Sequence, residues 1–218
     1  MKNEAFVREL EALRDSRMAD LTSAGRGAVR ETGESADPSK LLQVALANEI
    51  GVADLAAAAA AATSRTDIKL AFARQAGDEA RHFELVAARL APLGFDAAAF
   101  TPPGPNPLFD FLRELSDPVE RVAGLLFTLE AIAQGVNERF IQVCALRGDE
   151  ETVRIYREFI QPDEEAHARL GRTLLLEHAG SAELQDRVRA VVARTFDIAV
   201  AQRARAAERL GTRSFPGC

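Results

Sequence analysis

Two of the three histidines in this sequence stand in the same local context. Residues 78–82 read DEARH and residues 163–167 read DEEAH, so each histidine follows a glutamate by three positions and that glutamate follows an aspartate. Residues three apart on a helix lie on one face. A carboxylate and an imidazole placed in this way can reach one ion, and borderline transition metals accept mixed oxygen and nitrogen ligands. With ordinary usage of charged residues, chance produces the doubled pattern in roughly one such sequence in ten thousand. The candidate metal ligands are therefore Glu79, His82, Glu164 and His167.

These motifs need helices to position them, and the sequence predicts helices throughout. Alanine, leucine and arginine recur along the chain and are good helix formers. Asp37-Pro38 and Asp117-Pro118 each join a capping aspartate to a first-turn proline, which marks a helix start. The proline-rich segment 101–107 cannot be helical and separates two helical hairpins. We expect helices over about 4–21, 38–62, 68–90, 109–115, 117–146, 150–178 and 182–210, with a kink at Pro162, a Gly-, Ser- and Glu-rich connector over 23–35 and a tail over 211–218.

Two further carboxylates lie at matching heights in the expected hairpins. Glu49 and Glu79 stand 15 residues on either side of Ser64, in the first hairpin break. Glu130 and Glu164 stand 18 and 16 residues from the second break, a mismatch of about 3 Å at 1.5 Å rise per residue. Glu49 and Glu130 both lie in apolar runs, where a buried acid is costly unless it is paired or bound to a metal. The alternative for each is a solvent-facing position at the rim.

This arrangement resembles the ferritin-like diiron-carboxylate superfamily, in which two helices supply a glutamate and two supply Glu-x-x-His. The resemblance covers about residues 38–179. It implies an all-α, ferritin-like four-helix bundle, made of two helical hairpins with a long crossover and flanked by N- and C-terminal helices, in a single domain of residues 1–218. It also implies two iron ions, with manganese as the alternative metal, and Glu79 and Glu164 as bridging ligands. The implied ligands are Glu49, Glu79, His82, Glu130, Glu164 and His167.

The first motif is also similar to the Asp-Glu-x-Arg-His signature of bacterial diiron monooxygenase hydroxylases. In that pattern the acid before each glutamate supports the histidine of the opposite helix. Asp78 would then orient His167, and Asp163 would orient His82, because such carboxylates fix the imidazole tautomer. Arg81 would hold Asp163, or would simply be an exposed helix arginine. The second motif departs from the signature, with Ala166 where the first has Arg81, and the chain is far shorter than those hydroxylases.

Three activities are consistent with such a site. The first is O2 activation to oxidise or oxygenate a small organic substrate, with an electron-donor protein as partner. Gln134, one turn from Glu130, would then be a catalytic residue that hydrogen-bonds an oxygen species at the metals. Phe83, Phe127 and Ala131 would line a substrate cavity or simply fill the core. The alternatives are a ferroxidase or iron-storage protein, and peroxide removal of the rubrerythrin or manganese-catalase kind.

Composition excludes several other classes of function. The net charge is -6 without a basic block, so nucleic acid is not expected as a partner. The two cysteines form no CxxC pair and hence no rubredoxin-type site. The most apolar stretch, residues 52–63, is shorter than the roughly 20 residues that span a bilayer. We therefore expect a cytoplasmic protein with no membrane partner, and a homodimer, because extensive apolar helix faces favour symmetric association.

Overall fold

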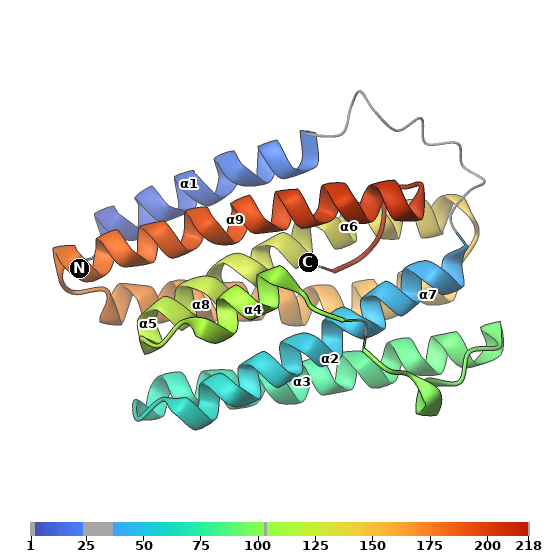
Figure 1. Ribbon diagram of the computed structural model, residues 1–218, viewed down its shortest axis with the longest axis horizontal. Coiled ribbons are helices and arrows are strands. Elements are labelled where there is room, and N and C mark those ends of the chain that lie inside the picture. The colour runs from blue at the N-terminus through green and yellow to red at the C-terminus, as the bar shows by residue number, and fades with distance from the viewer. Residues whose placement is uncertain (1–2, 24–36, 103, 218) are drawn as a thin grey trace.

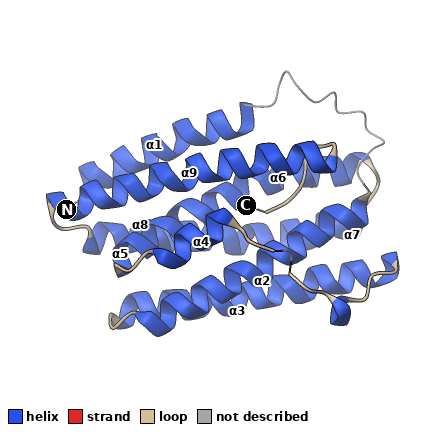
Figure 2. Cartoon of the chain, in the orientation of Figure 1, coloured by secondary structure: helices blue, strands red, loops and turns tan. Residues whose placement is uncertain are grey.

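The Asp-Pro pairs begin helices in the computed structural model, which describes residues 3–23, 37–102 and 104–217. Asp37 accepts a hydrogen bond from the backbone of Ser39 at the start of α2 (Pro38–Ala62). Asp117 caps α5 (Pro118–Arg121) in the same way. Every regular element in the described ranges is a helix (Figure 2), so the predicted all-α, ferritin-like fold class is confirmed.

The first hairpin consists of α2 and α3 (Thr66–Leu90), which pack against each other along their length. It lies on one side of the bundle in Figure 1. The helix α3 ends where Pro92 enters the short 3-10 turn η1 (Ala91–Leu93), and Gly94 follows with a left-handed φ of 83°. A second 3-10 turn, η2 (Ala97–Ala99), leads into the predicted proline-rich crossover. The crossover then reaches α4 (Pro107–Glu114), which Asn106 caps through its side-chain oxygen.

The second hairpin contains two π-helical segments that the sequence did not predict. Its first arm runs through α5, the π segment η3 (Val122–Leu129) and α6 (Glu130–Leu146). Its second arm runs through α7 (Glu150–Ile155), the π segment η4 (Tyr156–Ile160) and α8 (Gln161–His178). The sequence predicts a kink at Pro162, and in the structure η4 ends two residues before this proline. A wider turn there accommodates the proline, whose ring would clash with the carbonyl four residues earlier in a regular α-helix.

Two flanking helices cover the second hairpin. The helices α1 (Glu4–Ser23) and α9 (Ala182–Leu210) lie side by side in Figure 1, and α9 also contacts η3 and α4. Their bounds match the predicted ranges closely. Of the predicted connector, only Ser23 falls in the described part of the chain, where it ends α1. The rest of that connector lies outside the described residues.

A close helix contact positions the second hairpin. A Cβ atom added at Gly171 of α8 would lie 2.7 Å from the backbone nitrogen of Phe127 and 2.8 Å from the carbonyl carbon of Leu126. Glycine therefore lets α8 approach the backbone of η3.

The helix α2 is the most apolar helix of the first hairpin. By length and composition alone, its span Ser39–Ala62 is apolar enough to cross a membrane, and half of the most apolar window of this span is buried in the fold.

Candidate metal centre

The six predicted ligands converge at one level of the bundle. They come from α2, α3, α6 and α8, and each is at most 5% exposed to solvent. Burial of four acids at one place is costly unless each is paired or ligates a metal. The residues that the structure brings together are Glu49, Glu79, His82, Glu130, Glu164 and His167.

The first half of the cluster surrounds His82. Its Nδ1 atom lies 3.4 Å from Oε2 of Glu49 and 3.4 Å from Oε2 of Glu79. Glu164 belongs to the same group, in which all four potential ligand atoms lie within 4.8 Å of one another. These separations allow one ion to contact an imidazole nitrogen and three carboxylate oxygens.

The second half surrounds His167. Its Nδ1 atom lies 3.5 Å from Oε1 of Glu79 and 3.6 Å from Oε1 of Glu130. Glu79 therefore presents one oxygen to each histidine, which is the position expected of a bridging carboxylate. Glu164, the second bridging ligand that the resemblance implies, groups with the ligand atoms around His82.

Two aspartates support the histidines across the hairpins. Oδ2 of Asp163 lies 3.1 Å from Nε2 of His82, and Oδ2 of Asp78 lies 3.0 Å from Nε2 of His167. Each motif therefore supports the histidine of the other motif, in the crosswise pattern predicted from the sequence. The guanidinium of Arg81 lies 3.8 Å from Asp163 and also stacks over a phenylalanine ring. With Nε2 donating its proton to an aspartate, each imidazole has Nδ1 available as a ligand.

Four buried atoms of this cluster have no hydrogen-bond partner within the described structure: Oε1 of Glu79, Nδ1 of His82, Oε2 of Glu164 and Nδ1 of His167. Buried polar atoms are almost always hydrogen-bonded in native proteins, and exceptions call for an explanation such as a bound ion. All four belong to residues that the sequence pattern marks as ligands. The donor set therefore fits a metal pair on an observation independent of that pattern.

The pKa values of the cluster residues shift in opposite directions. Burial favours the protonated form of Glu79, but hydrogen bonds with His167 and His82 lower its pKa to about 2. Burial, together with the charges of Glu130, Glu79 and Glu49, raises the pKa of Glu164 well above its usual range. Burial likewise raises the pKa of Glu49. Burial alone would lower the pKa of both histidines, but the adjoining carboxylates raise it to about 11. Without a metal the cluster therefore holds protons on both imidazoles and on some of its acids.

Polar side chains that the sequence reasoning missed complete the surroundings. Gln75, one turn before Glu79 on α3, is fully buried and its amide donates to Glu130. A small cavity beside the ligands is lined in part by Asn48 and Asn137. Asn137 stands seven residues after Glu130, nearly two full helical turns, and that spacing was the available signal.

Gln134, predicted to be catalytic, is not among the residues that line this cavity. It is half-buried, and its backbone carbonyl accepts a hydrogen bond from Gln161. At 3.6 residues per turn it lies about 40° around α6 from Glu130, whereas Asn137 lies about 20° away. Phe83, Phe127 and Ala131, also predicted to line a cavity, are absent from the lining as well. Phe127 instead belongs to the hydrophobic core.

The end of the chain closes the same cavity. Gly217 lines it, and its backbone N–H donates to Oδ1 of Asn137 at 3.0 Å. Arg203 of α9 fastens this tail by donating to the carbonyls of Gly217 and Phe215 at 2.6 and 2.9 Å. The sequence had suggested only a tail at 211–218, and its last described residues are in fact buried.

The two π segments precede two of the ligands on the arms of the second hairpin. The segment η3 ends at Leu129, next to Glu130, and η4 ends at Ile160, four residues before Glu164. Such segments are rare and frequently occur at functional sites, because they rotate the following side chains out of regular α-helical register. They therefore help to set the direction of two ligands from the second hairpin.

Comparison with known proteins adds a family and a fold. Residues 11–211 match the model of a family described as "Protein of unknown function (DUF455)". No curated protein matches the sequence. Among solved structures, the chain is similar to a domain of unknown function with a heme oxygenase-like fold from Shewanella denitrificans OS217, with a TM-score of 0.61 and 13% identity over 97% of this chain and 96% of that one. At this identity the likeness shows the fold alone, an all-helical fold of the ferritin-like kind.

Proposed function

We propose that this chain, which belongs to the DUF455 family, is a non-haem diiron oxidoreductase that activates O2 to oxidise or oxygenate a small organic substrate. The observation that carries the proposal is the convergence of four buried carboxylates and two buried imidazoles, four of whose atoms have no hydrogen-bond partner in the described structure. Manganese remains the alternative metal.

The charge of the ligands supports a pair of divalent ions. Four ionised carboxylates and two neutral imidazoles carry a charge that balances two divalent cations, so the filled site would be neutral in a buried environment. Glu49, Glu164 and His82 would hold one ion, and Glu130 and His167 would hold the other. Glu79 would contribute to both. When bound, a ferrous pair supplies the electrons that reduce O2.

The surrounding residues have three tasks in this proposal. Asp78 and Asp163 keep a proton on Nε2 of each imidazole and so direct Nδ1 towards the ligand cluster. Gln75 donates to Glu130 and holds its carboxylate in place. The C-terminal tail and the apolar residues of the cavity wall, including Val52 and Leu129, exclude water from the reacting groups.

Substrate size and electron supply follow from the same surroundings. The cavity beside the ligands is small and its wall combines apolar side chains with the amides of Asn48 and Asn137. A small substrate that can hydrogen-bond to an amide suits this wall. The electron-donor protein, the homodimer and the cytoplasmic location remain predictions.

The proposal is tested by loading the metal-free chain with ferrous iron under anaerobic conditions and then mixing it with O2. An oxygenase or oxidase consumes about one O2 per metal pair and forms no mineral when excess iron is added. Continued oxidation of excess iron into a mineral core would indicate iron storage, and rapid loss of added peroxide with manganese bound would indicate a catalase. The variant Glu164→Gln should lose the reaction with O2. Its neighbour variant Glu165→Gln is the matched control, because Glu165 is exposed and pairs with Arg169 on the surface.

A further inference from the structure

The cavity beside the metal ligands has no room for an organic substrate in this structure. Only about 10 Å³ of it is open to water, which is room for about one molecule. Within the described wall, every residue except Gly217 belongs to a helix of the bundle. Gly217 belongs to the tail segment, residues 212–217, which lies outside every helix. A substrate can therefore reach the ligands only if part of this wall moves, and the tail segment is the part that the helices do not contain.

One peptide group of the tail segment lies between two buried asparagines. The side-chain amide of Asn48 donates to the carbonyl oxygen of Pro216 at 3.5 Å. The side-chain oxygen of Asn137 accepts the backbone N–H of Gly217 at 3.0 Å. This carbonyl and this N–H belong to the same peptide bond, so the two side chains contact both polar ends of one secondary amide. Asn48 is 8% exposed and Asn137 is 1% exposed, so little water competes for either contact.

The two asparagines also belong to the wall of the metal cavity. Asn48 directly precedes the ligand Glu49 on α2, and Asn137 stands nearly two turns after the ligand Glu130 on α6. All four side chains line the one cavity. A molecule whose amide replaced the tail peptide would therefore bring its neighbouring atoms beside the ligand cluster.

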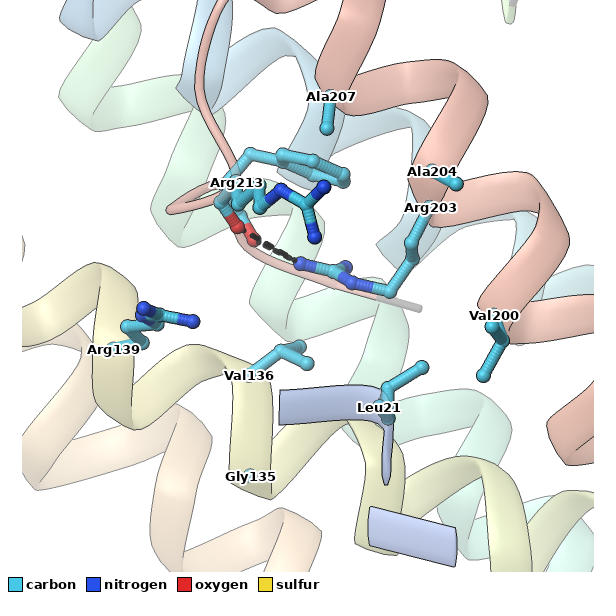
Figure 3. Close-up of a pocket in the computed structure, with 10 residues that line it drawn as sticks. Leu21, Gly135, Val136, Arg139, Val200, Arg203, Ala204, Ala207 and Arg213 are labelled. Carbon is cyan, nitrogen blue, oxygen red and sulfur yellow. Dashed lines mark hydrogen bonds between the residues drawn. The ribbon is translucent and has the colours of Figure 1, made fainter. Parts of the chain in front are cut away.

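The tail segment is held by polar contacts that can exchange with water. Arg203 of α9 donates to the carbonyls of Phe215 and Gly217 at 2.9 and 2.6 Å, and its guanidinium stacks on the ring of Phe215. Figure 3 shows this guanidinium directed from α9 towards the tail, with a dashed line for a hydrogen bond to a tail carbonyl. Water can replace such hydrogen bonds, but release of the tail also exposes the buried ring of Phe215. The closed form should therefore predominate until a ligand competes for the asparagines.

The contact at Gly217 limits what the asparagines accept. Gly217 has a left-handed φ of 78°, and a Cβ atom added to it would lie 2.0 Å from Nδ2 of Asn48. The space beside the amide nitrogen therefore fits an unbranched carbon and excludes a branched one.

We propose that Asn48 and Asn137 form an amide clamp, which binds a secondary amide of the substrate when the tail segment leaves. In the closed structure the peptide between Pro216 and Gly217 occupies the clamp, so the tail is an internal competitor of the substrate. The ligand class is a small molecule with one trans secondary amide whose nitrogen carries a CH2 group. Its role as substrate rests on the proposed function, whereas its binding to the clamp does not.

The test compares N-benzylacetamide with benzyl acetate, an ester of the same shape that lacks the N–H group. Binding to the metal-free full chain is measured by ligand-observed NMR titration. Two variants should release the tail by different means: Arg203→Ala removes its anchor, and Gly217→Ala forces it away from Asn48. Both should show faster hydrogen exchange in residues 212–217 and bind the amide at least about tenfold more tightly than the original chain, because the internal competitor is gone. Gly94→Ala is the matched control, since Gly94 has a similar φ of 83° but nothing within 4 Å of an added Cβ, and it should bind as the original chain does.

The ester tests the clamp without altering any side chain. In the released variants benzyl acetate should bind at least about tenfold more weakly than the amide, because it leaves the buried oxygen of Asn137 without a donor. Adding Asn137→Leu to Arg203→Ala should remove this preference. Equal binding of amide and ester in the released variants, no gain in affinity when exchange shows that the tail has left, or unchanged exchange in both variants would overturn the proposal. A chain that binds the amide as expected but does not react with O2 would contradict the proposed function alone.

Discussion

The crosswise support of the two histidines makes a specific prediction about metal affinity. Replacing Asp78 by Asn removes the charge that faces Nε2 of His167 at 3.0 Å, although Asp78 belongs to the same helix as His82. Replacing Asp163 by Asn removes the charge that faces Nε2 of His82 at 3.1 Å, although Asp163 belongs to the same helix as His167. Each variant should therefore weaken the metal position on the opposite hairpin.

The expected loss of metal affinity in each variant depends on how exposed the replaced aspartate is to solvent. Loss of a carboxylate that supports a metal-bound histidine typically costs about 10- to 100-fold in metal affinity, or roughly 1.4 to 2.7 kcal/mol. The side chain of Asp78 is 42% exposed and that of Asp163 is 31% exposed. Because solvent screens the more exposed charge, we expect about tenfold for Asp78→Asn and a larger loss for Asp163→Asn. Asp163→Asn also removes the carboxylate that faces Arg81, so the Arg81 guanidinium would lie near the bound metal ion without a compensating negative charge.

A double-mutant cycle assigns each aspartate to its histidine. Affinity is measured by anaerobic titration of ferrous or manganous ions against a competing chelator. Adding Asp78→Asn to His167→Ala should cost little more than His167→Ala alone, whereas adding it to His82→Ala should cost the full factor. The reasoning is refuted if Asp78 couples to His82 instead, or if Asp78→Asn and Asp163→Asn bind metal as tightly as the surface control Glu165→Gln.

Three further predictions concern protons, stability and packing. Metal affinity should fall as the pH is lowered, because the metal-free site holds protons on His82 and His167, whose pKa is raised to about 11, and these protons must leave when a metal binds. Calorimetry in two buffers of different ionisation enthalpy should therefore show release of about two to four protons per chain, and a value of zero would contradict this description. Glu164→Gln should leave the thermal stability of the metal-free chain unchanged or raised, because burial already favours the protonated acid. The variant should gain less stability from added metal than the original chain, for which the gain is about 2.7 kcal/mol at a hundredfold excess over Kd. An equal metal-dependent rise in Tm in both chains would count against Glu164 as a ligand. Gly171→Ala should destabilise the chain by about 1–3 kcal/mol in urea unfolding, because its Cβ would meet the backbone of η3. The control Gly77→Ala, which meets nothing within 4 Å, should be neutral or stabilising, and similar losses in both variants would contradict the packing argument.

The elements of the fold were predictable where single residues decide them. Asp37 and Asp117 cap helices in the structure as their side chains and following prolines predict, whereas the cap at Asn106 lies in a segment that we expected to be non-helical. Four of the six clustered residues were predictable from the doubled Glu-x-x-His pattern. Glu49 and Glu130 followed from their nearly matching distances to the hairpin breaks and from the resemblance to the diiron-carboxylate superfamily. The two π segments were not, since their conformation depends on packing between helices rather than on a local sequence signal.

The surroundings of the cluster were harder to predict than its ligands. Gln134 is the nearest polar residue after Glu130 on the same helix, yet the cavity is lined by Asn137, three residues further on. Which of these two side chains reaches the cavity depends on the rotation of α6 about its own axis, which the sequence does not specify. Gln75 stands one turn before Glu79, so its helical spacing was an available signal. The buried tail residues Phe215 and Gly217 carry no periodic pattern, so their positions emerge only from the tertiary structure.

The central claim is tested most directly by counting metal ions in the folded chain. Metal analysis after anaerobic loading with ferrous iron and removal of excess metal should give two ions per chain. The variant Glu79→Ala, which lacks the carboxylate that faces both histidines, should retain fewer than two ions while keeping its helical circular dichroism spectrum. A folded chain that binds no metal, or one that binds two ions equally well without Glu79, would contradict the account.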